Sequence, residues 1–176
     1  MNRIITTLVI AFFSNTFFAQ STFDKFDGRD EVTSIMVNKK MFDLMSKVKV
    51  DASDKEAQNY LNLIRKLDNL KVFTTSSVKI TAEMKYTTES YSKTAGLLEL
   101  MRINDSGQNI RILVKSGVNE DQIKELLMFI EGENKENQTI LMSLTGDFSL
   151  NEIPILTDKM RIPGGDFLNK ATKNKK

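Results

Sequence analysis

Two apolar-rich runs separated by a turn-forming segment limit the fold of this chain more than any other feature. Residues 97–103 and 110–115 flank residues 104–109, which read Asn-Asp-Ser-Gly-Gln-Asn. Such turn formers between two apolar runs are typical of a β-hairpin. In the second run, β-branched residues alternate with Arg111 and Lys115. One face is therefore predicted to be buried and the other to face water, as in an antiparallel sheet.

Other stretches predict further strands and helices. Three more segments rich in β-formers are expected to be strands, at residues 32–37, 70–75 and 139–144. Apolar residues at helical spacing predict five helices, at residues 39–48, 53–67, 80–91, 119–130 and 149–160. Two of these begin with the sequence of a capping box, Ser53 to Glu56 and Ser149 to Glu152.

Two of the expected helices direct a defined apolar face at the core. In the first, the inward residues are Met41, Phe42, Met45 and Val48. In the helix at residues 119–130, they are Ile123, Leu126, Leu127 and Ile130, and Gly132 follows as a stop signal.

The order of these elements favours an α+β fold. Strands and helices do not alternate strictly, which argues against a doubly wound parallel sheet. We predict a two-layer domain with a mixed, mainly antiparallel sheet and helices packed on one face. After the first 21 residues, about 155 remain, enough for one core rather than two. The single domain is expected to span residues 22–160, and because the chain has no cysteine it must be stable without disulfides.

Residues 1–21 have the three parts of a secretory signal peptide. Arg3 provides the positive charge, residues 4–13 are apolar or threonine, and Ala19-Gln20-Ser21 offers a small-x-small cleavage site. The alternative is an uncleaved membrane anchor, but this apolar stretch is about half of the ~20 residues needed to span a bilayer. We expect cleavage after Ser21 and export as a soluble protein. Without cysteine there is no acceptor for lipid attachment, so a lipoprotein is not expected.

The C-terminal segment, residues 161–176, is basic and is predicted to be a flexible tail. Ile162-Pro163-Gly164-Gly165 interrupts regular structure, and few apolar residues follow. Four lysines of this tail are candidate contacts to anionic lipid headgroups, at roughly 1 kcal/mol each close to the surface. The contact is expected to be weak and salt-sensitive. These lysines are Lys170, Lys173, Lys175 and Lys176.

Residues that commonly carry chemistry are sparse. The chain has no histidine and no cysteine, which removes the commonest metal and haem ligands and the usual general base and thiol nucleophile. No cofactor and no metal site are predicted. Paired carboxylates, as in glycosidases, stay open, although acidic residues near turns usually cap helices or face solvent. The candidates are Asp24, Asp27, Asp30, Glu31, Asp147 and Glu152.

Three further patterns have simple interpretations. Ser76-Ser77-Val78-Lys79 has the Ser-x-x-Lys form of a nucleophile pair but lacks the companion motifs. Met41 and Met45 lie one helical turn apart, as two Cu(I) ligands would, but both are on the apolar face, which favours packing in the core. Nucleic-acid binding needs a basic face with aromatic residues, whereas the basic excess here is confined to the tail. No nucleic-acid partner is predicted.

Five stretches resemble one protein family. They are Asp24-Lys25-Phe26, VTSIMVNKKMFDLM (residues 32–45), LELMRIN (98–104), KELLMFIEG (124–132) and LTGDFSLNEI (144–153). In sequence and order they are similar to the bacterial domain-of-unknown-function family 4252. The resemblance covers nearly the whole chain after residue 21 and implies a small exported protein with a similar leader. Because the family has no assigned activity, the resemblance implies no catalytic residue.

We therefore expect a periplasmic or extracellular bacterial protein that acts as a non-catalytic binding or regulatory module on another envelope protein. Two alternatives stay open: a carboxylate-dependent hydrolase of envelope polymers, and a carrier of an apolar small molecule. A hydrolase needs a cleft with carboxyls ~5–10 Å apart, and a carrier needs an internal cavity. A binding module needs an exposed apolar patch or sheet edge.

Overall fold

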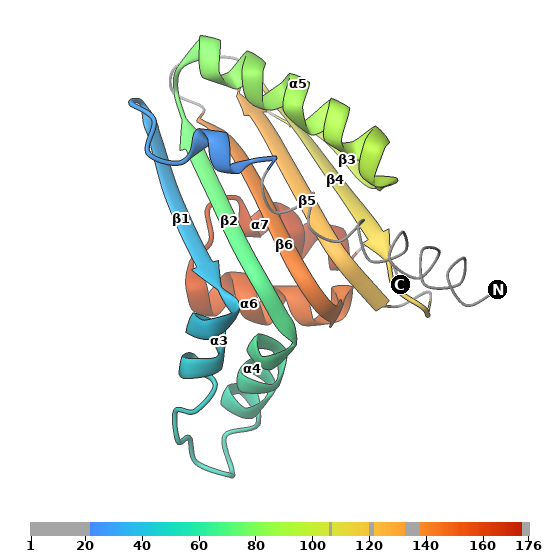
Figure 1. Ribbon diagram of the computed structural model, residues 1–176. Coiled ribbons are helices and arrows are strands. Elements are labelled where there is room, and N and C mark those ends of the chain that lie inside the picture. The colour runs from blue at the N-terminus through green and yellow to red at the C-terminus, as the bar shows by residue number, and fades with distance from the viewer. Residues whose placement is uncertain (1–21, 106, 120–121, 133–137, 174–176) are drawn as a thin grey trace, which may run out of the picture.

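The computed structural model describes residues 22–105, 107–119, 122–132 and 138–173, which form an antiparallel sheet with helices around it (Figure 1). The strands are β1 (Val32–Asn38), β2 (Leu67–Thr75), β3 (Leu98–Asp105), β4 (Gln108–Ser116), β5 (Gln122–Gly132) and β6 (Thr139–Ser149). The helices are α3 (Lys39–Met45), α4 (Lys55–Lys66), α5 (Val78–Ala95), α6 (Ile153–Met160) and α7 (Gly165–Lys173), with short 3₁₀ helices η2 (Asp24–Phe26) and η3 (Leu150–Glu152). The predicted α+β class is confirmed.

The six strands lie in the order β1-β2-β6-β5-β4-β3, and every neighbouring pair of the described sheet is antiparallel. β1 and β3 are therefore the two edges. The predicted hairpin is confirmed as β3 and β4. At its turn Gly107 has a φ of 76°, a conformation that glycine adopts without the cost of a side chain.

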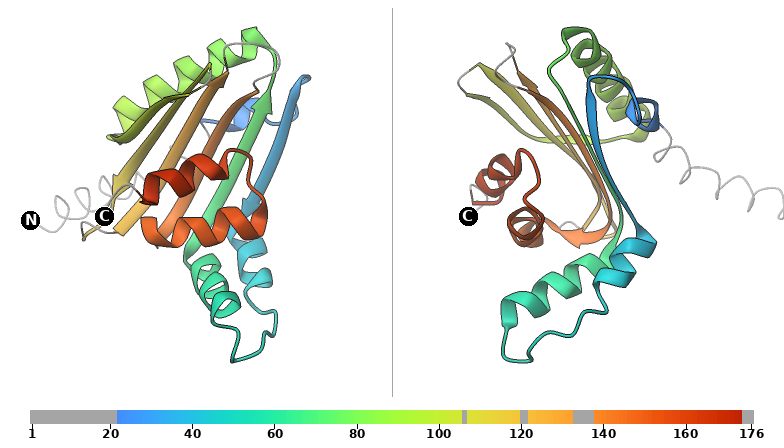
Figure 2. Two further views of the ribbon diagram at one scale, coloured as in Figure 1. Left: turned by 180° about the vertical axis from the view of Figure 1, so that it is seen from behind. Right: turned by 90° about the vertical axis from the view of Figure 1, so that its left-hand side faces the viewer.

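Helices cover both faces of the sheet, which differs from the expected single helical layer (Figure 2). α5 packs Ile80, Met84 and Tyr91 into a core on one face. The opposite core includes Ile64 of α4 and Leu156 of α6. Buried side chains alternate between these cores along β5 and β6, so the central strands are covered on both sides.

Strand β5 replaces the helix predicted at residues 119–130, and that prediction is wrong. Met128 belongs to the core on the α6 side and is 0% exposed, whereas Phe129 belongs to the core under α5 and is 2% exposed. A strand buried on both faces has a continuous apolar run instead of alternation. Several positions of that run also happen to fit helical spacing, so periodicity alone does not separate the two structures.

Local caps fix where the helices begin. Ser149 and Glu152 form the predicted capping box, in which the Ser149 N–H donates to Glu152 Oε2 at 2.9 Å. At α4 the cap is Asp54, whose Oδ1 accepts from the N–H of Ala57 at 2.9 Å. Asp54 therefore takes the role predicted for Ser53.

Helix α7 lies within residues 161–176, the segment expected to be a flexible tail. Leu168 is 2% exposed and belongs to the core on the α6 side, against which Phe167 also packs. Thr157 Oγ1 of α6 donates to Asn169 Oδ1 at 3.0 Å. These contacts hold residues 167–169 against α6 and the core beside it. No helix among the described residues is long and apolar enough to cross a membrane.

Alanine substitutions in β5 test the two-sided burial. We expect Met128→Ala and Phe129→Ala each to lower the free energy of unfolding by about 2–5 kcal/mol, because each opens a cavity in a different core. A helix with the predicted inward residues would turn both side chains outward, where substitutions usually change stability by less than about 0.5 kcal/mol. Urea denaturation measures the difference, with exposed Lys124→Ala as control. Equal stabilities of all three variants would contradict the strand.

Candidate functional site

Helix α3 carries apolar side chains on two of its faces. Phe42 is buried, and Met45 packs partly buried against the same core, as predicted. Met41 and Leu44 of α3 and Val48 of the loop that follows it are spaced three and four residues apart but are 50%, 54% and 60% exposed. We call these three residues the α3 stripe. The prediction that Met41 and Val48 face the core is wrong.

The position of α3 explains why one apolar face stays in water. α3 and α4 project beyond the end of the sheet (Figure 1), so only the inner side of α3 meets the core. Five of the nine large apolar side chains that are exposed among the described residues lie between residues 35 and 48. Single exposed apolar residues are ordinary, but their concentration in one region makes this region the candidate interaction surface.

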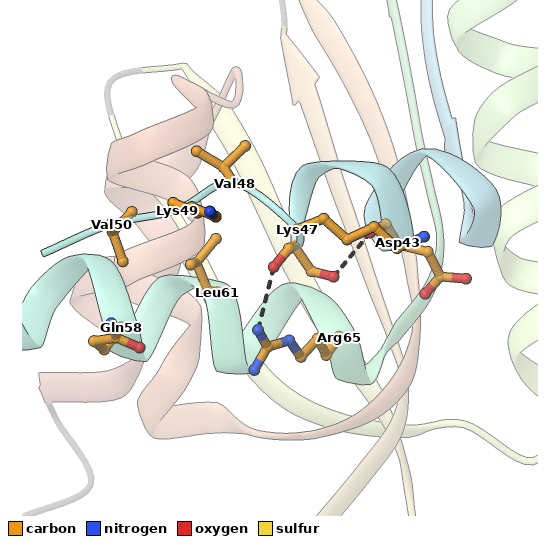
Figure 3. Close-up of a pocket in the computed structure, with 9 residues that line it drawn as sticks. Asp43, Lys47, Val48, Lys49, Val50, Gln58, Leu61 and Arg65 are labelled. Carbon is orange, nitrogen blue, oxygen red and sulfur yellow. Dashed lines mark hydrogen bonds between the residues drawn. The ribbon is translucent and has the colours of Figure 1, made fainter. Parts of the chain in front are cut away.

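A hollow of about 740 Å³ lies between α4 and the loop that follows α3 (Figure 3). We call it the α3–α4 hollow. Its lining residues are Asp43, Ser46, Lys47, Val48, Lys49, Val50, Gln58, Leu61 and Arg65. Three cations against one carboxylate favour an anionic group, and the aliphatic residues favour an apolar one. The hollow is open to solvent, so it is not the internal cavity that a carrier of an apolar molecule needs.

Arg65 connects the two walls of the α3–α4 hollow. Its Nη2 donates to the carbonyl oxygen of Ser46 at 3.2 Å, and its Nη1 donates to Asn62 Oδ1 at 3.3 Å. A guanidinium has five N–H donors, so further donors remain for a carboxylate. Lys47 and Lys49 are exposed and take part in no ion pair of the described residues. Lys47, Lys49 and the remaining N–H groups of Arg65 are therefore available to an anionic group.

The cationic residues of this hollow are not among the site residues predicted from the sequence. A signal was present, because residues 39–50 contain Lys39, Lys40, Lys47 and Lys49 but one acidic residue, Asp43. Arg65 could not be found in the same way, since it comes from the next helix. Only the fold brings Arg65 to the loop.

Four of the six carboxylates named from the sequence form separate ion pairs or hydrogen bonds. The ion pairs are Asp24 with Lys71 at 2.5 Å, Asp147 with Lys124 at 2.8 Å, and Glu152 with Lys66 at 2.7 Å. Asp27 Oδ1 accepts from Ser34 Oγ at 2.5 Å, and Asp30 and Glu31 are exposed. No group of three or more acidic side chains among the described residues is placed to hold a metal ion.

Only two of the four tail lysines belong to a described element of the structure. Lys170 and Lys173 fall in α7, but their side chains lie outside the described part of the structure. Lys175 and Lys176 lie outside the described residues altogether. Their contact with anionic lipid stays a prediction.

Glu125 of β5 is a buried carboxyl that the sequence analysis did not single out. It is 4% exposed, and Tyr91 Oη donates to its Oε2 at 2.9 Å. Its Oε1 has no hydrogen-bond partner among the described residues, and neither has the hydroxyl of Thr145, its register neighbour on β6. Burial raises the pKa of Glu125, while the Tyr91 hydrogen bond and the charge of Lys115 oppose this shift. Tyr91 belongs to α5, so this buried carboxyl links the helix to the sheet.

The raised pKa of Glu125 makes stability depend on pH. The native state holds this proton more tightly than the unfolded chain, whose glutamate pKa is about 4.3. The contribution of Glu125 to the free energy of unfolding is therefore fully present below about pH 4, and it is lost as pH rises through the pKa of the native state. We expect Glu125→Gln to become progressively more stable relative to the wild type as pH rises, measured by urea denaturation.

Glu99→Gln is the matched control for that experiment. Hydrogen bonds and charge from Arg102 and Arg111 hold the pKa of Glu99 below its usual range. Its stabilising contribution is therefore present above the unfolded pKa and is lost as pH falls. Glu99→Gln should lose stability relative to the wild type as pH rises, opposite to Glu125→Gln. Two profiles with the same slope would contradict the burial effect at Glu125.

These features define a class of protein: a small α+β domain with an antiparallel sheet between helices and an exposed apolar and cationic surface at one end. The family model "Domain of unknown function (DUF4252)" matches residues 26–156. The chain belongs to this family, which confirms the resemblance seen in the sequence. Neither a curated protein nor a solved structure matches the chain.

Proposed function

We propose that the protein is an exported, non-catalytic binding module of the bacterial envelope. Its partner is another envelope protein, which it recognises through an acidic and partly apolar segment that enters the α3–α4 hollow. One observation carries this proposal: the exposed α3 stripe borders the cationic hollow, and Val48 belongs to both. The leader-like residues 1–21 support the location.

The two parts of the surface would contribute in different ways. Burying a large apolar side chain is favourable by about 1.5–3 kcal/mol, so covering a half-exposed one contributes about half of this. The α3 stripe would thus supply most of the affinity. The lysines would accelerate encounter with an acidic segment and select against basic ones. Because Lys47 and Lys49 are exposed, their contribution falls as salt increases.

A photo-crosslinking amino acid at Leu44, introduced in the bacterium that makes the protein, tests the proposal. We expect a discrete crosslinked envelope protein whose contacted segment, mapped by mass spectrometry, contains Asp or Glu next to apolar residues. The control position is Tyr86 of α5, which is 73% exposed and lies on another surface. It should give no such product. The same products from both positions would overturn the proposal.

Charge reversal then tests the chemistry of recognition. With the mapped segment as a synthetic peptide, Lys47→Glu combined with Lys49→Glu should weaken binding by about tenfold or more in low salt, which corresponds to about 1.4 kcal/mol. The matched control is Lys79→Glu with Lys93→Glu on α5, which changes net charge equally on another surface. It should leave binding nearly unchanged. Binding of the purified protein to phosphatidylglycerol vesicles, without any segment captured at Leu44, would assign the surface to lipid and overturn the protein partner.

A further inference from the structure

Strand β1 is an exposed edge of the sheet that lacks the usual protection. Among the described strands it pairs with β2 alone, and its register continues without a shift from Val32 to Asn38. The strand reads VTSIMVN, with no charged residue and no proline. Ile35 and Met36 are each 45% exposed. Proteins normally place lysine, proline or a bulge on such an edge to prevent pairing with another chain.

The opposite edge, β3, has these protective features. Glu99 pairs with Arg102 of the same strand at 2.8 Å and with Arg111 of β4 at 2.9 Å. The register of β3 with β4 shifts between Glu99 and Met101, as at a β-bulge. The contrast identifies β1, rather than β3, as the edge that is available to another strand.

We propose that β1 pairs antiparallel with β1 of a second copy of this chain, about a two-fold axis at Ile35. The two six-stranded sheets then continue into each other. In this register Ile35 faces its own equivalent, and Ser34 faces Met36 of the other copy. The interface is isologous, so each contact occurs twice.

The charges at the two ends of β1 fit this antiparallel arrangement. Asp30 and Glu31 precede the strand, and Lys39 and Lys40 follow it. In an antiparallel pair, the acidic turn before β1 of one copy lies near the basic start of α3 that follows β1 of the other copy. Parallel pairing would instead place like charges together, which is unfavourable.

Three of these four charged residues have side chains available to a second copy. Asp30, Glu31 and Lys40 are exposed, and none of them takes part in an ion pair of the described residues. Lys39, in contrast, donates to the carbonyl oxygens of Arg65 and Leu67 at 2.7 and 3.1 Å. A foreign strand would need its own charges at both ends, whereas a second copy already carries them.

Sedimentation velocity on the chain from residue 22 onward tests the proposal. We expect a reversible dimer at concentrations up to about 100 μM, the range of a weak, specific contact. Ile35→Lys should give a monomer, because a lysine on the edge opposes strand pairing. The matched control is Leu98→Lys on β3, where Leu98 is 67% exposed; it should leave the dimer intact. Circular dichroism checks that both variants fold.

A charge exchange separates pairing at β1 from any other dimer contact. Lys40→Glu alone and Asp30→Lys alone should each weaken the dimer by about tenfold, since each places like charges across the axis twice. Mixing the two variants should form a heterodimer, and the double variant should recover the wild-type dimer.

Three outcomes would overturn self-pairing: a wild-type monomer at these concentrations, equal loss in Ile35→Lys and Leu98→Lys, or failure of the mixture to associate. None of the substituted residues lines the α3–α4 hollow. The result is therefore independent of the proposed partner binding.

Discussion

Strands β5 and β6 pack apolar side chains against helices on both faces of the sheet, and a chain without cysteine depends on this two-sided burial for its stability. Leu127 and Phe129 enter the core under α5, while Met128 and Ile130 enter the core on the α6 side. Each fully buried side chain of this size contributes about 1.5–3 kcal/mol. Neither core is complete without segments from near the chain ends, because Phe23 and Phe26 close one core and Leu168 closes the other. These end segments pack on the sheet because their apolar side chains complete the two cores.

The same two-sided burial decides what could be predicted from the sequence. Residues on β4 alternate enough for the hairpin to be visible, and Ile80, Met84 and Tyr91 of α5 are buried at the predicted helical spacing. β5 was missed because its run of apolar residues has no polar face. The apolar residues of a doubly covered strand satisfy several periodicities at once. Its length and position become clear only when both neighbouring strands are known.

The candidate binding surface was missed for the opposite reason. Apolar residues at helical spacing are expected to face the core, so the sequence predicts that Met41 and Val48 point inward with Phe42 and Met45. α3 ends near the margin of the sheet and has a core on one side only, so its second apolar face remains in water. The hollow beside it also needs Arg65 from α4. Local sequence contains the lysines and the stripe, but their grouping is a property of tertiary structure.

The two proposed surfaces are compatible because β1 leads directly into α3. In an antiparallel β1 pair, each α3 follows the end of its own strand, so the two α3–α4 hollows lie at opposite ends of the joined edge. Seven residues at about 3.4 Å each separate these ends by roughly 24 Å. One partner chain spanning both hollows would need a connection of at least about seven extended residues. With a connection near that length, the second segment would bind at a high effective concentration; with a shorter one, the dimer would hold two separate partners.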